Sequence, residues 1–450
     1  MKSAKVIRSP FLPGIRQFLC PALCIAFVLV SGCQAGKSTP NSSFTLAVIP
    51  DTQNYIDFRH QKAEGFELDS SVLFIEQMQY IADHSTSNGG DIAFASAVGD
   101  VWQHQTRTID AGHLQRGIGI EPDPILARNS VRVEPVLKVE IPTAIEGYRI
   151  ISEAGLPFAV APGNHDYDAT WSVSGYPPNR DRKFHELERT VEDMGILHVG
   201  GLDNFRSAFG ENTDFFKNKS WYIASHNGGA NSAQRFSAGG YRFLHLALEM
   251  QPGDDVISWA ESVLAANPGL PTIITTHDYL NASGERQPHA LIDLVRVDPN
   301  YHNSAQQTWD SLFSRHDQIF LVLCGHQRGQ SMRTDANVNG KLVYQVLADY
   351  QDRGQAGIDA GRSKRFTGIG DGWFRLMQFD FSGESATVTV KTYSSYFSKF
   401  SGEVVNYANW YKAREQPSLS DLEFYAADDF IIRLDDFFQR FGKPDHAAQD

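Results

Sequence analysis

The chain has 450 residues, of which 42% are hydrophobic and 21% charged, as in an ordinary globular protein with one large domain or two smaller ones. The formal net charge of -13 argues against a protein that coats DNA or RNA, because that role needs a basic face. A phosphate-bearing substrate is not excluded, since bound metal cations can reverse the local field.

The N-terminus has the features of a targeting segment. A basic stretch is followed by an apolar run, residues 18–30, which is too short to span a bilayer comfortably and is typical of a signal peptide. The run leads into Val30-Ser31-Gly32-Cys33, which resembles a bacterial lipobox, where a cysteine is lipidated and becomes the mature N-terminus. Gln34 follows, and in such lipoproteins a residue other than aspartate favours sorting to the outer membrane. The alternative is an ordinary signal peptide cut near Ala35.

We therefore expect residues 1–32 to be a lipoprotein signal peptide and residues 33–43 a polar tether, with Cys33 as the lipidated residue. The protein would then be exported and anchored by lipid to a membrane, at the outer membrane or the periplasmic face. Two of the other cysteines lie in the signal, so Cys324 has no internal disulfide partner and the fold must rest on its core. Cys324 ends an apolar run and is expected to be a buried small hydrophobic residue.

Short, continuous apolar runs recur along the chain and predict strands that are buried on both faces. The spacing of apolar residues predicts helices over residues 71–83 and 254–266. Residues 374–381 and 386–393 flank a polar tetrapeptide and predict an antiparallel hairpin. Alternation of strands and helices predicts an α/β layered domain. The runs are 44–49, 92–98, 157–161, 243–248, 272–276, 319–324 and 342–347.

We expect one domain over residues 44–396, followed by an aromatic-rich appendage, residues 397–450, packed on it. Two insertions, residues 104–145 and 167–240, interrupt the domain with few clear strands and many Gly, Asn and Pro residues. Long insertions beside motif-bearing strands often shape a substrate cleft, although ordinary surface elaboration explains them equally well.

Polar side chains follow five of the predicted strands. They include Asp, Asn and His, which are hard or borderline metal ligands, and neighbouring glycines let the backbone turn sharply. In open α/β sheets, ligands gather at the carboxyl ends of strands. A single such group is a weak signal, but five in series predict a metal site. The groups are Asp51-Thr52-Gln53, Gly99-Asp100, Gly163-Asn164-His165-Asp166, His277-Asp278 and Gly325-His326.

In these groups and their order the chain resembles the calcineurin-like metallophosphoesterases, over residues 44 to 395. The resemblance implies a two-layer β-sandwich flanked by helices, with a two-metal site. It implies that Asp51 binds the first metal and that Asp100 bridges both. The second metal would be held by Asn164, His277 and His326.

The same resemblance implies hydrolysis of a phosphate ester by metal-activated water, outside the cytoplasm. His165 would be the general acid or would stabilise the transition state, and Asp166 would orient it. Asn164 and His165 would also contact the substrate.

Two positions depart from the commonest family pattern, in which the first group is Asp-x-His and the last is Gly-His-x-His. Gln53 and Arg328 replace histidines that belong to the first metal. Gln53 can still coordinate through its amide oxygen, whereas the Arg328 guanidinium has no free lone pair. We therefore expect one firmly held divalent ion and a weaker second one, and Mn, Fe, Zn and Ca are not distinguished. Arg328 either binds the substrate phosphate and assists catalysis, or faces away.

Residues beside the motifs are weaker candidates. Asp349-Tyr350-Gln351 resembles a segment near the site in exported relatives and is a candidate substrate contact, and Trp102 is expected to pack. His245 lies within an apolar run and is expected to be a satisfied core histidine. Further candidates for the cleft or its rim are Asn54, Tyr55, His104 and Tyr279.

Other functions stay open. Loss of two histidines suits a degenerate surface lipoprotein that binds a metal or ligand without catalysis, whereas the intact Asp100, Asn164 and His277 favour an enzyme. A site for sulfate or phosphonate esters is a third alternative. Neither the natural substrate, nor monoester versus diester preference, nor the oligomeric state follows from the sequence. The long insertions and the absence of a basic patch favour a small or medium substrate over nucleic acid.

Overall fold

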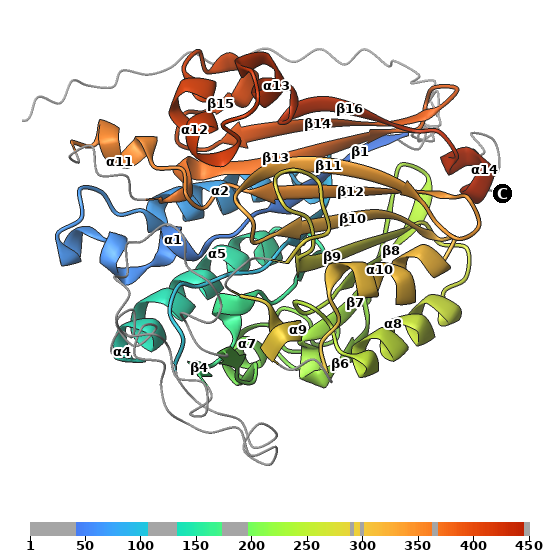
Figure 1. Ribbon diagram of the computed structural model, residues 1–450, viewed down its shortest axis with the longest axis horizontal. Coiled ribbons are helices and arrows are strands. Elements are labelled where there is room, and N and C mark those ends of the chain that lie inside the picture. The colour runs from blue at the N-terminus through green and yellow to red at the C-terminus, as the bar shows by residue number, and fades with distance from the viewer. Residues whose placement is uncertain are drawn as a thin grey trace, which may run out of the picture. The chain divides into compact units, whose positions relative to one another are not determined.

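The computed structural model describes residues 42–106, 133–172, 197–288, 292–297, 301–361 and 368–444. These residues form a mixed α/β fold with two mixed sheets (Figure 1). The predicted signal peptide, the lipidation residue Cys33 and the predicted tether up to residue 41 lie outside the described residues. Within the described ranges, every helix is too short or too polar to cross a membrane.

The first sheet has the strand order β15-β14-β13-β1-β2-β3, and β16 also pairs with β14. β1, β2 and β3 are parallel to one another, whereas β13 and β14 form an antiparallel hairpin, as predicted. The strands are β1 (Ser43–Ile49), β2 (Ile92–Ala97), β3 (Phe158–Val160), β13 (Trp373–Asp380), β14 (Ala386–Ser394), β15 (Lys399–Phe400) and β16 (Asp429–Leu434).

The second sheet has the order β11-β12-β10-β9-β8-β7-β6, and its middle strands β12, β10, β9 and β8 are parallel. Its strands are β6 (Tyr222–His226), β7 (Asn231–Ala238), β8 (Tyr241–Ala247), β9 (Thr272–Asp278), β10 (Ile319–Gly325), β11 (Gly329–Ala336) and β12 (Leu342–Asp349). A small separate sheet pairs β4 (Thr170–Ser172) with β5 (Leu197–Val199).

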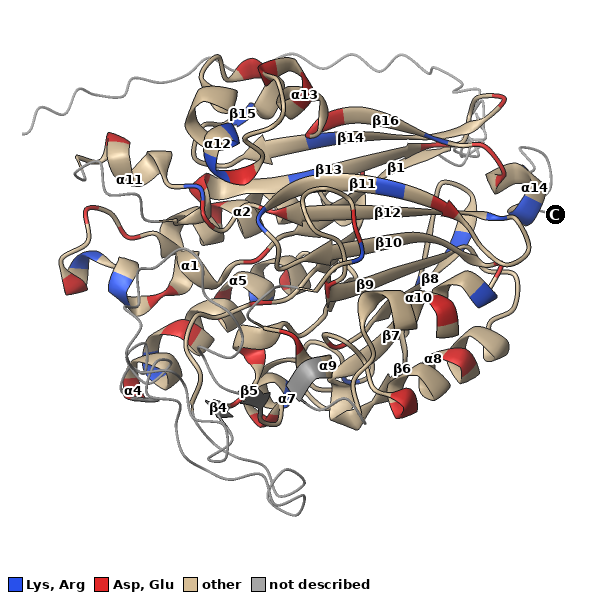
Figure 2. Cartoon of the chain, viewed as in Figure 1, with Lys and Arg blue, Asp and Glu red and all other residues tan. Residues whose placement is uncertain are grey.

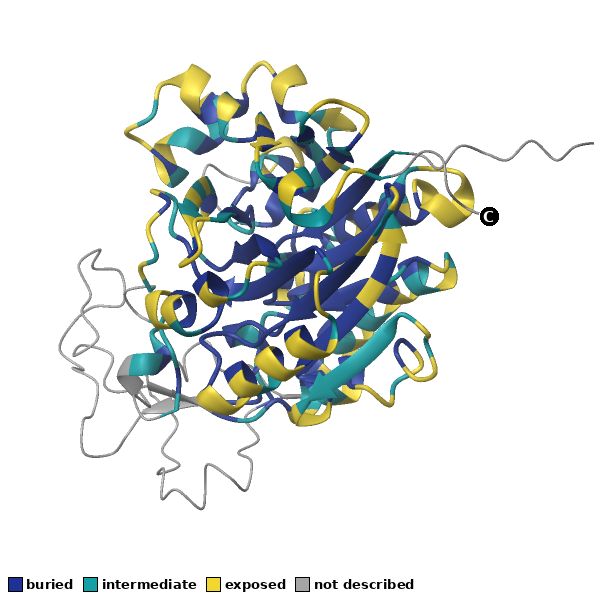
Figure 3. Cartoon of the chain, turned by 90° about the vertical axis from the view of Figure 1, so that its right-hand side faces the viewer, coloured by how far each residue is buried: buried dark blue, intermediate teal, exposed yellow. Residues whose placement is uncertain are grey.

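The two larger sheets pack face to face through an aromatic core. The ring of Phe44 on β1 stacks on Phe379 at 4.8 Å and lies 5.2 Å from Phe243 of the second sheet. The central strands are buried and carry few charged residues (Figures 2 and 3). This explains why continuous apolar runs located them correctly, because both faces of these strands contact other protein layers.

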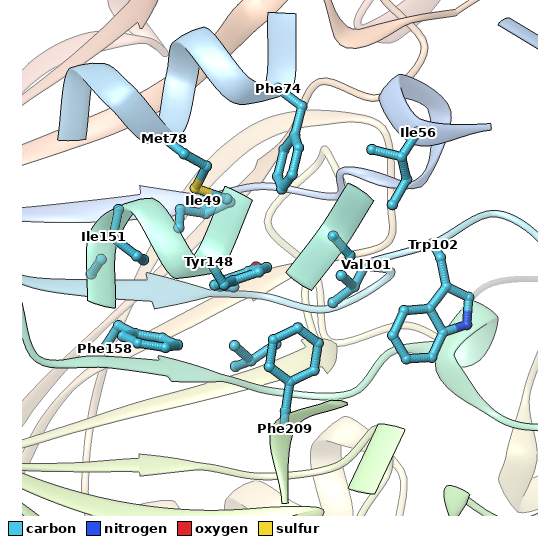
Figure 4. Close-up of a cluster of buried hydrophobic side chains, with 14 of the residues drawn as sticks. Ile49, Ile56, Phe74, Met78, Val101, Trp102, Tyr148, Ile151, Phe158 and Phe209 are labelled. Atoms are coloured by element: carbon cyan, nitrogen blue, oxygen red, sulfur yellow. The ribbon is translucent and has the colours of Figure 1, made fainter. Parts of the chain in front are cut away.

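Helices α2 (Ser71–Asp83) and α5 (Ile141–Glu153) cover the outer side of the first sheet. Phe74 and Met78 of α2 point toward Tyr148 of α5 (Figure 4). Gly147 lets the helices approach closely, since a Cβ there would lie 2.3 Å from the ring of Phe74.

Helices α8 (Asp254–Ala266) and α10 (Ala305–Ser311) pack on the second sheet through a separate apolar cluster. The bounds of α2 and α8 confirm the predicted helices. The other α-helices in the described part of the chain are α1 (Gln53–Ile56), α4 (Val133–Pro135), α7 (Asp203–Phe209), α9 (Leu294–Val297), α11 (Gln355–Asp359), α12 (Tyr407–Glu415), α13 (Asp421–Ala426) and α14 (Phe437–Phe441).

The predicted insertion over residues 167–240 contains β6 and β7, which belong to the second sheet. Sequence patterns missed β7 because several of its buried residues are polar. Asn231, Ser232 and Gln234 are buried and hydrogen-bonded, so the strand has no apolar run. The C-terminal segment is likewise part of the first sheet, since β15 and β16 both pair with β14.

Candidate metal centre

Strands of both sheets deliver polar side chains to one buried cluster. β1, β2 and β3 of the first sheet lead to Asp51, Asp100 and Asn164, and β9 and β10 of the second lead to His277 and His326. The ligand atoms of Asp100, His277 and His326 all lie within 4.8 Å of one another, and all three residues are buried. The predicted groups thus converge although up to 275 positions separate them in the chain.

His277 Nε2 lies at the middle of this cluster. It is 3.1 Å from Asp100 Oδ1 and 3.1 Å from His326 Nδ1. It is also 3.2 Å from Asn164 Oδ1 and 3.9 Å from Asp51 Oδ2. One imidazole nitrogen cannot satisfy four such groups at once, whereas a cation accepts several oxygen and nitrogen ligands together.

The backbone is shaped to bring these groups together. Asp100 and His326 have positive φ values of 52° and 70°, which are uncommon for residues with a side chain. A Cβ at Gly163 would lie 2.3 Å from Asp100 Oδ1, and one at Gly325 would lie 2.2 Å from Asp51 Oδ1. The glycines of the motifs therefore allow ligand carboxylates to approach neighbouring backbone.

The orientation of His277 suits a metal ligand. Its Nδ1 lies 2.9 Å from the carbonyl oxygen of Val98, which can only accept, so Nδ1 carries the proton and Nε2 faces the cluster. Burial acts to lower the pKa of His277, but the carboxylates of Asp100 and Asp51 outweigh it and raise that pKa to about 10. The cluster therefore favours a positive charge at its centre.

The pKa values of the Asp100 and Asp51 carboxyl groups shift in opposite directions. Burial opposes ionisation of Asp100, but attraction by His277 and His165 holds its pKa well below the usual range. Burial raises the pKa of Asp51 well above its usual value, and the negative charge of Asp349 raises it further. An excess of buried carboxylate is the condition under which a divalent cation binds favourably.

His165 lies at the edge of the cluster and is 28% exposed. Its backbone N–H donates to Asp100 Oδ1 at 2.8 Å. Its Nδ1 lies 2.6 Å from the carbonyl oxygen of Gln103, so Nδ1 is a donor and Nε2 faces the cluster, 3.9 Å from Asp100 Oδ2.

Asp166, predicted to orient His165, makes other contacts. Its carboxylate accepts from the backbone N–H groups of Gly163 at 2.7 Å and Val101 at 2.9 Å. It joins the loops that follow β2 and β3, and the carbonyl of Gln103 orients the imidazole instead. Burial and the charge of Asp100 raise the pKa of Asp166 to about 7.

Gln53 reaches the cluster from α1. Its Nε2 donates to Asp100 Oδ2 at 3.2 Å and to Gln351 Oε1. Gln53 is 1% exposed, and its Oε1 has no hydrogen-bond partner among the described residues. Gln351 also donates to Asp349 Oδ2 at 3.0 Å, so the Asp349-Tyr350-Gln351 segment contacts the cluster through Gln53.

Arg328 follows the last motif but is 57% exposed and forms an ion pair with Asp352. Arg414 of α12 donates to the same carboxylate at 3.2 Å. Two guanidinium groups thus share the carboxylate of Asp352. The positive charge of Arg328 also acts to lower the pKa of the nearby Asp349. Arg328 lies outside the buried cluster, on its exposed side.

Comparison with known proteins gives little further guidance. No protein-family model matches the chain. A stretch of 233 residues is 29% identical to the uncharacterized protein YvnB of Bacillus subtilis strain 168. The match covers 48% of this chain but only 16% of that protein. A partial similarity of this kind transfers no activity, so function must be argued from the site itself.

A second buried group, Asp57, His104 and Glu140, could also hold a metal ion, since its ligand atoms lie within 4.8 Å of one another. Glu140 accepts from His104 Nδ1 at 2.6 Å, from the His104 N–H at 2.9 Å and from the Phe58 N–H at 3.2 Å. Asp57 pairs with Arg59 at 2.9 Å. Sequence reasoning missed this group because no motif precedes Glu140, which ends the π-helical turn η5 (Val136–Glu140).

Other candidates are core residues. His245 is buried, with Nδ1 3.0 Å from Gln234 Oε1 and Nε2 2.9 Å from Thr275 Oγ1, which confirms the predicted core histidine. Cys324 is buried and free, and Trp102 packs in the core near Phe205 and Phe209 of α7, both as predicted.

Proposed function

We propose that this chain is a metal-dependent phosphoesterase of the calcineurin-like type, which hydrolyses a phosphate ester with water. The observation that carries the proposal is the buried contact of Asp100, His277 and His326, with Asp51 and Asn164 beside them. These residues come from five separate strand ends, and a purely structural role would not require so many ligand-type groups around one nitrogen.

The donor set fits divalent cations. Two imidazoles, an amide oxygen and carboxylates suit Mn, Fe or Zn, and Asp100 has oxygens facing both His277 and Gln53. A bound cation would activate water, neutralise phosphate charge and orient the ester for in-line attack.

His165 is placed to move a proton. Its Nδ1 is engaged by the carbonyl of Gln103, so any exchangeable proton sits on Nε2, on the side that faces Asp100. A protonated His165 can donate from Nε2 to the leaving oxygen, and the same group can hydrogen-bond a phosphoryl oxygen. Its partial exposure supports contact with a substrate that enters from solvent.

The exposed side of the site supports an anionic substrate. Arg328 is exposed and shares the carboxylate of Asp352 with Arg414. The exposed guanidinium of Arg328 can pair with a phosphate group. Arg328 would then contact the substrate phosphate, which is one of the two alternatives that the sequence leaves open.

Export and lipid anchoring through Cys33 remain part of the proposal and rest on the sequence of residues 1–43. The enzyme would then act outside the cytoplasm at a membrane surface. The alternative, a non-catalytic surface protein, is favoured by the replacement of two histidines by Gln53 and Arg328.

Hydrolysis of aryl phosphate monoesters and diesters, assayed with added Mn²⁺, Zn²⁺ or Ca²⁺, tests the proposal. His277→Ala and Asn164→Ala each remove a ligand atom and should reduce the rate by at least about 100-fold. His84→Ala, an exposed histidine at the end of α2, is the matched control and should retain activity. Activity in the wild type that both ligand variants retain would refute the assignment of the site. No activity with any metal would favour the binding protein.

A further inference from the structure

We propose that Asp51, Gln53 and Asp349 form an oxygen-only cation site beside the imidazole cluster. We call this the oxygen half-site, and we call Asp100, Asn164, His277 and His326 the imidazole half-site. The inference rests on the proposed function and deepens it, because it assigns the ligands that stand in for the two replaced histidines. Asp349 is the new ligand.

The sheet places Asp349 at the same edge as the other ligands. β12 runs parallel to β10, with Leu347 opposite Cys324. β10 ends at Gly325 and β12 ends at Asp349, so both strands bring their last residues to the same edge of the sheet. The backbone N–H of His326 donates to both carboxylate oxygens of Asp51, at 3.2 and 3.1 Å. The residue after β10 thus contacts the carboxylate of Asp51.

A chain of amide contacts connects Asp349 to the cluster. Gln351 donates from its Nε2 to Asp349 Oδ2 at 3.0 Å and from its backbone N–H to Asp349 Oδ1 at 3.0 Å. Gln351 Oε1 in turn accepts from Gln53 Nε2, which also donates to Asp100 Oδ2. These bonds hold the Asp349 carboxylate, and each of its oxygens still has a lone pair for a further partner.

The amide of Gln53 supplies an independent indication of a ligand. Its Nε2 lies between two acceptors, Asp100 Oδ2 and Gln351 Oε1, so the reversed orientation would bring oxygen against oxygen. This fixes the position of Oε1, which is buried and has no partner among the described residues. A buried carbonyl oxygen is unfavourable without a partner, and a cation would satisfy it.

The ligand chemistry of the two half-sites differs. Two carboxylates and an amide oxygen suit hard cations such as Ca²⁺, Mg²⁺ or Mn²⁺. The imidazoles of His277 and His326 suit Zn²⁺ and other borderline metals. Asp349 supplies the negative charge that Gln53 cannot, so the first metal position is altered rather than lost. We expect the protein to hold two unlike ions.

Metal binding to the full mature chain, after removal of metals with a chelator, tests this inference. Calorimetric titration with Ca²⁺ and, separately, with Zn²⁺ should give one site for each ion. Asp349→Asn should weaken Ca²⁺ binding at least tenfold and leave Zn²⁺ binding within about twofold of wild type. His277→Ala should weaken Zn²⁺ binding at least tenfold and leave Ca²⁺ binding within about twofold of wild type.

Asp352→Asn is the control for a general loss of negative charge at this edge, since Asp352 lies three residues on and pairs with Arg328. It should leave Ca²⁺ affinity unchanged. An equal loss in both variants, or none in Asp349→Asn, overturns the oxygen half-site while Zn²⁺ binding and hydrolysis stand. Absence of hydrolysis and of Zn²⁺ binding overturns the proposed function, and the Ca²⁺ titration still decides this inference.

A second ligand variant, checked for folding, guards against misfolding as an explanation. Gln53→Leu removes the buried Oε1 without changing the bulk of the side chain greatly, and it should weaken Ca²⁺ binding at least tenfold. Thermal unfolding of each metal-free variant shows whether it is folded. Unchanged Ca²⁺ binding in a folded Gln53→Leu protein contradicts a cation at this position.

Discussion

At the scale of single residues, burial gives two histidines of this chain opposite electrostatic states. His277 is fully buried, but Asp100 and Asp51 raise its pKa to about 10. His245 is equally buried but has only neutral hydrogen-bond partners, Gln234, Ser96 and Thr275, and burial lowers its pKa to about 3. The neighbouring carboxylates, not the depth of burial, decide which histidine attracts positive charge.

We expect His245 to make the protein sensitive to acid. Its pKa in the folded state lies below the unfolded value of 6.5, so the folded state binds fewer protons. This contribution to stability is fully present above pH 6.5 and is lost as the pH falls toward 3. The free energy of unfolding should drop by roughly 2 kcal/mol between pH 7 and pH 5 because of this residue.

Urea unfolding of wild type and His245→Gln over this pH range measures the effect. The glutamine variant cannot take up the proton, so its pH dependence should be shallower. The same slope in both proteins would show that other groups cause the acid sensitivity.

At the scale of elements, the loop after β2 is held by a residue from a different element. Glu140 at the end of η5 accepts two hydrogen bonds from His104, one from its backbone and one from its ring. The residue before, Gln103, uses its carbonyl oxygen to hold His165 Nδ1. Glu140 is therefore a positioning residue for His165, through the backbone of this loop.

Glu140→Ala should release the loop and lower kcat of phosphate-ester hydrolysis about tenfold with little change in KM. The unpaired donors should also cost about 1–3 kcal/mol of stability. Glu140→Gln keeps an acceptor oxygen and should recover part of the rate. The matched control is Glu146→Ala, since Glu146 is exposed on α5 and pairs only with Arg149 among the described residues.

The pH dependence of kcat distinguishes positioning from simple destabilisation. A mobile His165 should shift or flatten the limb of the profile that reports the general acid. A lower rate with an unaltered pH profile in folded Glu140→Ala would assign Glu140 to stability alone.

At the scale of the whole described fold, a buried ionic network joins the C-terminal segment to both sheets. Asp428 accepts from Arg375 Nη2 of β13 at 2.6 Å and from Arg353 Nη2, beyond β12, at 3.4 Å. Tyr350 and Thr392 donate to the same carboxylate at 2.7 and 3.0 Å. The segment after residue 396 thus neutralises two arginines that are buried beneath it.

Asp428→Ala should destabilise the protein by about 3–5 kcal/mol, because it removes the carboxylate that pairs with the buried Arg375, whereas Arg353 keeps Glu415. Asp421→Ala is the control, since Asp421 is exposed and pairs with Lys412, and its loss should cost less than about 1 kcal/mol. Urea unfolding at neutral pH measures both. Equal midpoints for the two variants would show that the network adds little.

Much of the fold and half of the site could be predicted because their causes are local. Strands buried on both faces require apolar runs, and the bounds of α2 and α8 follow from the spacing of apolar residues. The five polar groups could be found because each directly follows a strand. Strand β7 could not be predicted, since its buried Asn231, Ser232 and Gln234 are polar and leave the strand without an apolar run.

The sequence by itself determined which residues stand at the strand ends, because side-chain chemistry and strand periodicity depend on residues that are adjacent in the chain. Only the tertiary structure decided which of them meet. It brought Asp349 and Gln351 to Gln53 and Glu140 to His104, and it left Arg328 exposed. The physical reason is that coordination depends on distances of a few ångströms between atoms, and these are set by how two sheets pack, not by spacing along the chain.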